Sequence, residues 1–170
     1  TYAEDADVLA LKPSLAIIAT GGVPNVDWLP GSEFLTSAWD ILSGVATPAE
    51  DALIVDGTGR HVALSAADVC HAHGTLVTFA TIDETLAAEQ SYAESVIWRK
   101  WAREIQLPMH TEEALIGVRR DGNQVVATLR SELTGQETEL RTAQVIFDYG
   151  TLPADGVYRE LSGKSSNRGV

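Results

Sequence analysis

The sequence predicts an α/β fold, built from a parallel sheet with a helical crossover and an added antiparallel β-meander. Short apolar runs rich in β-branched residues and bounded by Gly, Pro or Asp indicate buried strands. Because these runs are almost continuously hydrophobic, they are typical of parallel strands covered on both faces. The runs lie at 14–19, 52–55, 76–80 and 143–147.

Two helices are predicted between these strands. Residues 60–73 carry Ala, Leu and Val at helical spacing and are followed by Gly74, so 52–80 reads as a strand, helix, strand unit. A second helix is predicted over 91–106, where Ser91 and Glu94 form a capping box. Its apolar stripe is expected to cover the sheet, through Ile97, Trp101 and Ile105.

After Pro108 the pattern changes to short alternating strands separated by hairpin turn signals. This pattern predicts an antiparallel meander with strands at 114–120, 124–131 and 136–141.

The chain also contains a weak internal echo. The segments 17–25 and 145–154 both run from an apolar strand to Gly, with Pro three residues later. Two such exits around a complete unit suggest an inserted domain, with 52–142 inside and the exits leading to a different sheet. The predicted boundaries give three segments, at 1–46, 47–142 and 143–170.

Charge and composition exclude several classes of function. The chain has 170 residues, with 12 Lys and Arg against 24 Asp and Glu, a net charge of −12 and one cysteine, Cys70. This acidity argues against nucleic acid and anionic membranes as partners. One cysteine excludes a disulfide framework or a four-thiolate metal site within the chain. No apolar run approaches the ~20 residues of a spanning helix, so a soluble, cytoplasmic protein without a metal site is expected.

The strongest candidate for ligand binding is the loop Gly57, Thr58, Gly59 and Arg60, which follows a strand and opens a helix. In a dinucleotide fold such glycines let a diphosphate approach the backbone at a helix N-terminus. Three features depart from that pattern. Asp56 puts a carboxylate next to the loop, Val62 replaces the third glycine, and Asp83 lies beyond the expected acidic position. A nucleotide site and a purely structural Rossmann loop both remain open.

A second loop, Thr20, Gly21 and Gly22, follows the first predicted strand. It is either a ligand-approach point or a tight turn that needs glycine. No Ser-His-Asp set or Walker loop is present, and no catalytic residue is predicted in this chain.

Several of these motifs together resemble a known family. The runs Leu11–Asn25, Thr36–Gly44 and Val55–His61 resemble the C-terminal nucleotide-binding region of the NADH:flavin oxidoreductases related to trimethylamine dehydrogenase and 2,4-dienoyl-CoA reductase. The ending of the chain is similar to the subgroup that demethylates N-methylated amino acids such as dimethylglycine or N-methylproline. The resemblance covers essentially the whole chain.

The resemblance implies a larger enzyme, with FMN and an iron–sulfur cluster in an N-terminal barrel. The fold expected here is a Rossmann-like parallel sheet with a β-meander, plus part of a second, FAD/ADP-type Rossmann-like domain. Residues 1–46 would close that FAD/ADP-type domain, 47–142 would resemble an NAD(P)H domain, and 143–170 would return to the first. Thr20, Gly21 and Gly22 would contact FAD or ADP, and the Gly57 loop NAD(P)H.

The resemblance also sets the expected partners and the rival functions. Partners would be the N-terminal barrel, an electron-transferring flavoprotein and, as a further candidate, a second copy of the chain. The leading hypothesis is a region of an amine dehydrogenase or demethylase that binds a nucleotide or relays electrons and is inactive alone. The alternatives are a non-catalytic Rossmann-like scaffold and an NAD(P)H-binding domain of the enoyl-reductase type.

Overall fold

The computed structural model describes residues 4–164 and divides the chain into two compact units. One unit is Pro24–Gly150, and the other combines the residues before Pro24 with those after Gly150. Each unit is described by itself.

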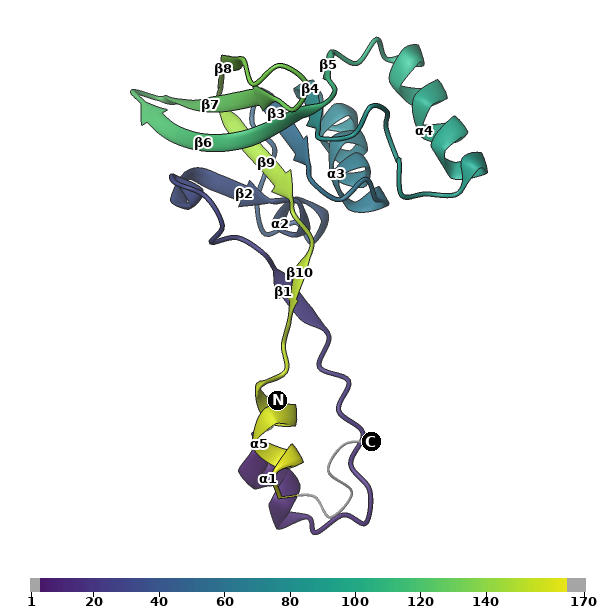
Figure 1. Cartoon of the computed structure of the whole chain (residues 1–170), viewed down its shortest axis with the longest axis vertical. Coiled ribbons are helices and arrows are strands. Elements are labelled where there is room, and N and C mark those ends of the chain that lie inside the picture. Colours follow the sequence, from purple (N-terminus) through teal and green to yellow (C-terminus); the bar gives the residue numbers. More distant parts are fainter. Residues whose placement is uncertain (1–3, 165–170) are drawn as a thin grey trace. The chain divides into compact units, whose positions relative to one another are not determined.

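The Pro24–Gly150 unit contains a five-stranded sheet in the order β2-β9-β3-β4-β5 (Figure 1). Every pairing in it is parallel. The predicted strands at 52–55, 76–80 and 143–147 are therefore confirmed, while the two edge strands were not predicted. The strands are β2 (Leu35–Ser37), β3 (Asp51–Asp56), β4 (Leu76–Thr81), β5 (Met109–His110) and β9 (Gln144–Asp148).

Helix α3 (His61–Ala72) joins β3 to β4, as the predicted crossover requires. Its small residues, including Ala63 and Ala67, lie fully buried in one cluster with the sheet residues Ile54 and Phe79. Small side chains let the helix approach the sheet closely. Helix α2 (Ala38–Leu42) and the short 3-10 helix η1 (Ser32–Phe34) precede β3.

Helix α4 (Tyr92–Glu104) begins at the predicted capping box, in which Ser91 accepts from the Glu94 backbone N–H. The predicted apolar stripe is wrong at Ile97, whose side chain is 64% exposed. The other two predicted residues, Trp101 and Ile105, are partly buried against the same cluster as α3, together with the buried Ala102 and the partly buried Trp98. Because each residue turns the helix by about 100°, the packing of Trp98 directs Ile97 outward, and α4 lies beside α3 rather than over the sheet (Figure 1).

The predicted meander is confirmed as an antiparallel three-stranded sheet. It covers the sheet face opposite to the α3 cluster, because Leu53 and Val55 of β3 point to the meander while Ala52 and Ile54 belong to the α3 side. Successive strand residues alternate between faces, so β3 is buried on both. The meander strands are β6 (Glu113–Asp121), β7 (Gln124–Ser131) and β8 (Glu137–Thr142).

The other unit contains α1 (Asp5–Ala10), α5 (Gly156–Ser162), β10 (Thr151–Pro153) and the first two residues of β1 (Gly22–Pro24), which pairs with β10. The two predicted exits thus meet in a sheet of their own. The strand predicted at 14–19 is wrong: the segment has no strand pairing, and Leu15 and Ile17 are 73% and 82% exposed. A strand needs a neighbour for its backbone donors and acceptors, and no described residue supplies one.

The boundaries of the compact units differ from the predicted 46/47 and 142/143. Strand β9 pairs with β3 along five residue pairs, from Ala52 with Gln144 to Asp56 with Asp148, and it also pairs with β2. It is a central strand and not a return strand, because these hydrogen bonds hold it inside the sheet. The cofactor types assigned to the two domains stay predictions.

In residues 4–164, no helix is both long and apolar enough to cross a membrane.

Candidate functional site

The predicted residues Gly57, Thr58, Gly59 and Arg60 lie together between β3 and α3, at the carboxyl edge of the parallel sheet. The chain leaves β3 toward β4 on one side, while β9 lies on the other side. This point, where the strand order reverses, is where α/β folds bind ligands in the crevice outside the strand ends. The contacts around the loop therefore decide what it can hold.

The backbone donors of the loop are taken by a carboxylate of the same chain. Asp56 is fully buried, and its Oδ1 accepts from the N–H groups of Thr58 at 2.9 Å and Gly59 at 3.0 Å. The Gly57 N–H donates to the carbonyl of Asp148, also at 2.9 Å. Three N–H groups that could face a diphosphate are thus satisfied internally.

A second carboxylate shares the hydroxyl of Thr58. The Thr58 Oγ1 lies 3.1 Å from Asp56 Oδ1 and 3.0 Å from Asp148 Oδ2, and it can donate its single hydrogen to only one of them. Asp56 Oδ2 is buried without a hydrogen-bond partner among the described residues. Burial and, to a smaller extent, the charge of Asp148 raise the pKa of Asp56 to about 6, although the hydrogen bonds from Thr58 and Gly59 oppose this shift.

An aromatic pair closes one side of the loop. Tyr149 directly follows β9, and a Cβ on Gly57 would lie 2.5 Å from its ring. The Tyr149 ring stacks on Trp28 with centroids 3.7 Å apart. Desolvation raises the pKa of Tyr149 to about 12, so the phenol is neutral at physiological pH. The sequence reasoning missed both residues, although Tyr149 lies inside the echo segment 145–154.

The segment after β4 closes the opposite side. Gly59 has a φ of +64°, and a Cβ there would lie 2.6 Å from Asp83 Oδ2. The Glu89 N–H donates to the Gly59 carbonyl at 3.0 Å. Desolvation raises the pKa of Asp83, and the charge of Glu89 adds to the shift. Asp83 thus lies beside the loop, although it comes later in the chain than a ribose-binding acid should.

These contacts do not fit a bound diphosphate. The loop is surrounded by carboxylates, its N–H groups are used, and a side chain fills the space beside each glycine. Arg60 is exposed and is the cation that the loop itself contributes. The residues around the loop therefore do not suit NAD(P)H.

The second predicted site lies in the other unit. Thr20 Oγ1 donates to the Ala154 carbonyl, and the Ala154 N–H donates to the Gly21 carbonyl at 3.0 Å. A Cβ on Gly22 would lie 2.7 Å from the Leu152 carbonyl oxygen, so Gly22 is needed for the approach of β10. Gly21 is exposed, with nothing within 4 Å of an added Cβ. Of the three, Gly21 is the residue whose backbone a ligand could approach.

Within residues 4–164, no three His, Cys, Asp or Glu side chains are arranged to hold a metal ion. Cys70 is buried, and desolvation raises the pKa of its thiol to about 11.

Comparison with known proteins places this fold among oxidoreductases. The chain is 36% identical over 170 residues to a probable N-methylproline demethylase of Rhizobium meliloti. It is 30% identical over 177 residues to an N,N-dimethylglycine/sarcosine dehydrogenase of Chromohalobacter salexigens. Each match covers 99% of this chain, but only 25% and 26% of the relative. No family model matches the chain.

Solved structures agree with this fold. The histamine dehydrogenase of Rhizobium sp. 4-9 superposes with a TM-score of 0.83 at 14% identity, over 96% of this chain and 27% of that one. The fold and the relatives together define the chain as a Rossmann-like region of an oxidoreductase. The resemblance that the motifs predict is confirmed: over almost its whole length the chain is similar to amine demethylases and dehydrogenases, and it spans about a quarter of these curated relatives.

Proposed function

We propose that this chain is the nucleotide-domain region of an amine demethylase or dehydrogenase, and that it has no catalytic activity by itself. In this proposal it contributes to an FAD or ADP site at Gly21, together with parts of the polypeptide outside this sequence. The Pro24–Gly150 unit is then a structural Rossmann-like domain that does not bind NAD(P)H. The observation that carries the proposal is the buried Asp56 carboxylate, which takes the loop donors a diphosphate would need.

The proposal assigns different roles to this chain and to the cofactors of the whole enzyme. When bound, FAD or ADP would supply electron-transfer chemistry or nucleotide anchoring, and this chain would supply backbone contacts. The iron–sulfur cluster belongs in the rest of the enzyme by this proposal, because a cluster needs several thiolates and the chain has one buried cysteine. FMN is assigned to the same part of the enzyme, as the resemblance implies. Electrons would pass to a separate carrier such as an electron-transferring flavoprotein.

The exposed apolar segment before β1 supports a larger polypeptide. Leu11, Leu15 and Ile17 are 80%, 73% and 82% exposed, and α1 and α5 contain no buried residue among those described. An apolar surface of this kind marks an interaction site in a soluble protein. We assign it to contact with the remainder of the enzyme.

NADH and NADPH at about millimolar concentration are expected to produce no binding heat with the purified protein. A dissociation constant of about 1 mM corresponds to a binding free energy near −4 kcal/mol, so any binding should be weaker than this. The physical reason is that the loop presents carboxylates and no free N–H groups to a diphosphate. Isothermal titration calorimetry measures this directly. Saturable NADPH binding that is weakened by Arg60→Glu would contradict the proposal that the Gly57 loop cannot hold a diphosphate. It would favour an NAD(P)H-binding domain of the enoyl-reductase type.

Gly21→Asp is expected to weaken ADP or FAD binding by about tenfold or more, because a carboxylate would face the phosphates at short range. The φ of +68° at Gly21 makes the substitution strained, but nothing lies within 4 Å of the added Cβ, so the variant should still fold. Gly44→Asp is the matched control: Gly44 also has a positive φ and open space around it, but lies in the other unit. Equal affinities in the two variants would favour the scaffold function.

A further inference from the structure

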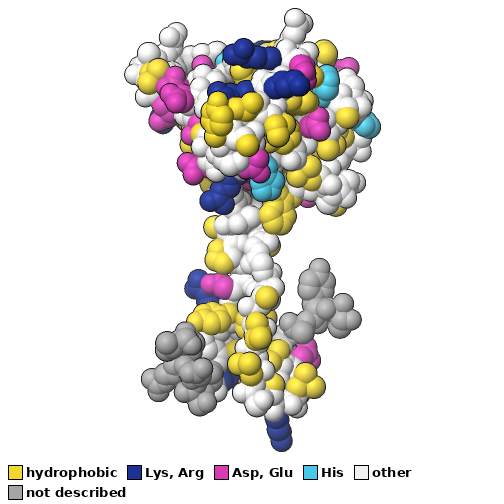
Figure 2. Space-filling view, turned by 90° about the vertical axis from the view of Figure 1, so that its right-hand side faces the viewer, with side chains coloured by type: hydrophobic (Ala, Val, Ile, Leu, Met, Phe, Trp, Pro, Cys, Tyr) yellow, Lys and Arg dark blue, Asp and Glu magenta, His cyan; other side chains and the backbone are white. Residues whose placement is uncertain are grey.

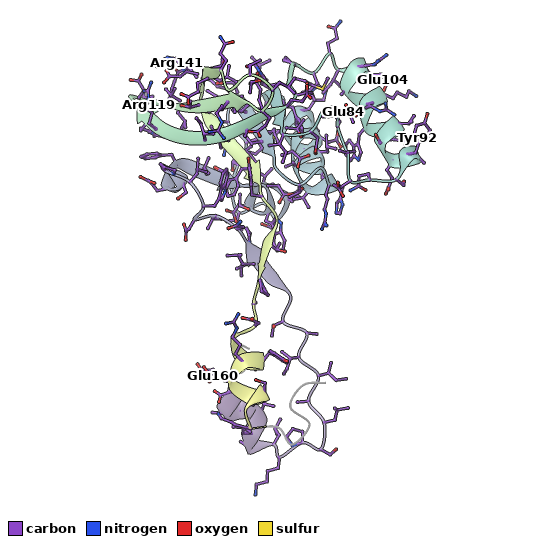
Figure 3. The ribbon with its side chains drawn as sticks, viewed as in Figure 1. Glu84, Tyr92, Glu104, Arg119, Arg141 and Glu160 are labelled. Atoms are coloured by element: carbon purple, nitrogen blue, oxygen red, sulfur yellow. The ribbon has the colours of Figure 1, made fainter. Side chains whose placement is uncertain are left out.

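The outward face of α4 carries an unusual combination of side chains. Tyr92, Val96, Arg99 and Arg103 follow each other at spacings of four, three and four residues, which places them in one stripe along the helix. Tyr92 is 82% exposed and Val96 39%. Figure 3 shows Tyr92 and Glu104 near the two ends of this helix. Trp98 and Ala102 pack on the core from another side of the helix, so the stripe lies beside the packed side, with Tyr92, Val96 and Arg103 exposed and Arg99 half-buried.

The second half of the stripe is positively charged. Arg99, Lys100 and Arg103 line a groove of about 450 Å³ together with Val96 and Glu104. Lys100 lies 3.6 Å from Glu104, and both side chains are more than half exposed. Such an exposed ion pair contributes little to the free energy of folding. Arg99 Nε donates to the Ser95 carbonyl, and Arg103 takes part in no ion pair within residues 4–164.

Three arginines of the meander are paired with carboxylates of this chain. Arg119 pairs with Glu139, Arg141 with Asp121, and Arg130 lies near Glu132; Figure 3 labels Arg119 and Arg141 on the meander. Arg60 and Arg120 form no ion pair among residues 4–164, but they are single cations, whereas the α4 face groups three cations with one carboxylate in a chain of net charge −12. Figure 2 looks at the side that carries α4, where dark blue Lys and Arg side chains lie next to yellow hydrophobic ones.

We propose that this face of α4 docks an acidic protein surface that presents carboxylates around an apolar side chain. Carboxylates of the partner would pair with Arg99, Lys100 and Arg103, and its apolar side chain would cover Val96 and the Tyr92 ring. Complementary charge favours fast and specific encounter, while aromatic and arginine side chains are the commonest anchors of protein interfaces. A nucleic acid fits less well, because its phosphates extend beyond the three cations of this face over a chain of net charge −12, whereas a partner protein needs carboxylates only opposite those cations.

The probe for this proposal is a fluorescein-labelled helical peptide with glutamates flanking leucines on one face, titrated with the purified protein and followed by fluorescence anisotropy. The double variant Lys100→Glu, Arg103→Glu is expected to weaken binding about tenfold or more, and the corresponding double Gln variant by less. Both positions are exposed, so folding is preserved. Lys12→Glu with Arg120→Glu changes the net charge equally at exposed positions outside α4 and should bind as the parent protein does.

The apolar half gives an independent readout. Tyr92→Ser with Val96→Ser should weaken peptide binding even in high salt, where ion pairs are screened. Absence of peptide binding, or equal weakening in the Lys12 and Arg120 control, would overturn the proposal. It would also be overturned if sedimentation showed self-association that the Lys100 and Arg103 variant abolishes, because the occupant would then be a second copy of this chain.

Discussion

Replacing Gly31 with alanine is expected to lower the free energy of unfolding by about 3 kcal/mol or more, the range of severe single substitutions. Gly31 has a φ of +86°, and a Cβ there would lie 1.7 Å from the backbone carbonyl oxygen of Val118. Neither group can move alone, because the Val118 N–H donates to the adjacent Pro30 carbonyl at 3.1 Å. The substitution must therefore separate the loop before η1 from β6.

Urea unfolding followed by circular dichroism measures this effect. Gly44→Ala is the matched control, since Gly44 has a φ of +75° but nothing within 4 Å of an added Cβ. We expect Gly44→Ala to cost only the about 1–2 kcal/mol of a left-handed alanine. A cost for Gly31→Ala no larger than that of Gly44→Ala would show that the contact with β6 is not rigid.

Asp56→Asn is expected to make the protein less sensitive to pH and more stable above neutrality. The pKa of Asp56 is raised from 3.8 to about 6, mainly by burial. Between these values the native state holds a proton that the unfolded state has lost, so stability falls as pH rises through this window and stays low above it. About two pKa units correspond to about 3 kcal/mol.

The asparagine keeps an oxygen acceptor for the N–H groups of Thr58 and Gly59 and removes the buried charge. Its NH₂ group would take the place of Oδ2, which has no partner among the described residues, and this offsets about 1–3 kcal/mol of the gain. The stability difference between variant and parent should therefore increase from pH 4 to pH 7. Asp56→Ala, which removes the acceptor as well, should lose stability throughout. A difference between Asp56→Asn and the parent that does not change with pH would show that Asp56 titrates normally.

Local patterns predicted most of the Pro24–Gly150 unit. The crossover helix, the central strands and the meander follow from periodicity, because each is buried on a face that its own sequence defines. The capping box at Ser91 located α4 correctly, but the buried stripe depended on how Trp98 meets α3. The edge strands β2 and β5 are short and acquire their conformation from their neighbours in the sheet.

The candidate site likewise has features that the sequence predicts and features that depend on contacts between distant segments. The sequence determined that a glycine loop follows a buried strand and opens a helix, with Asp56 beside it, and the motifs predicted the resemblance to flavin-dependent oxidoreductases. Only the tertiary structure decided that the loop is closed. Tyr149 reaches Gly57 from the end of β9 and stacks on Trp28, and Asp83 reaches Gly59 from the segment after β4.

The apolar run at 14–19 is the opposite case, in which the sequence predicts an element that the structure does not form. Its composition predicts a strand, yet it forms no strand pairing and is mostly exposed, because a strand exists only when a neighbour satisfies its backbone. The sequence alone thus determined which residues favour burial and which turns need glycine. The tertiary structure decided which of those residues find a partner, since contacts between distant segments depend on the whole fold.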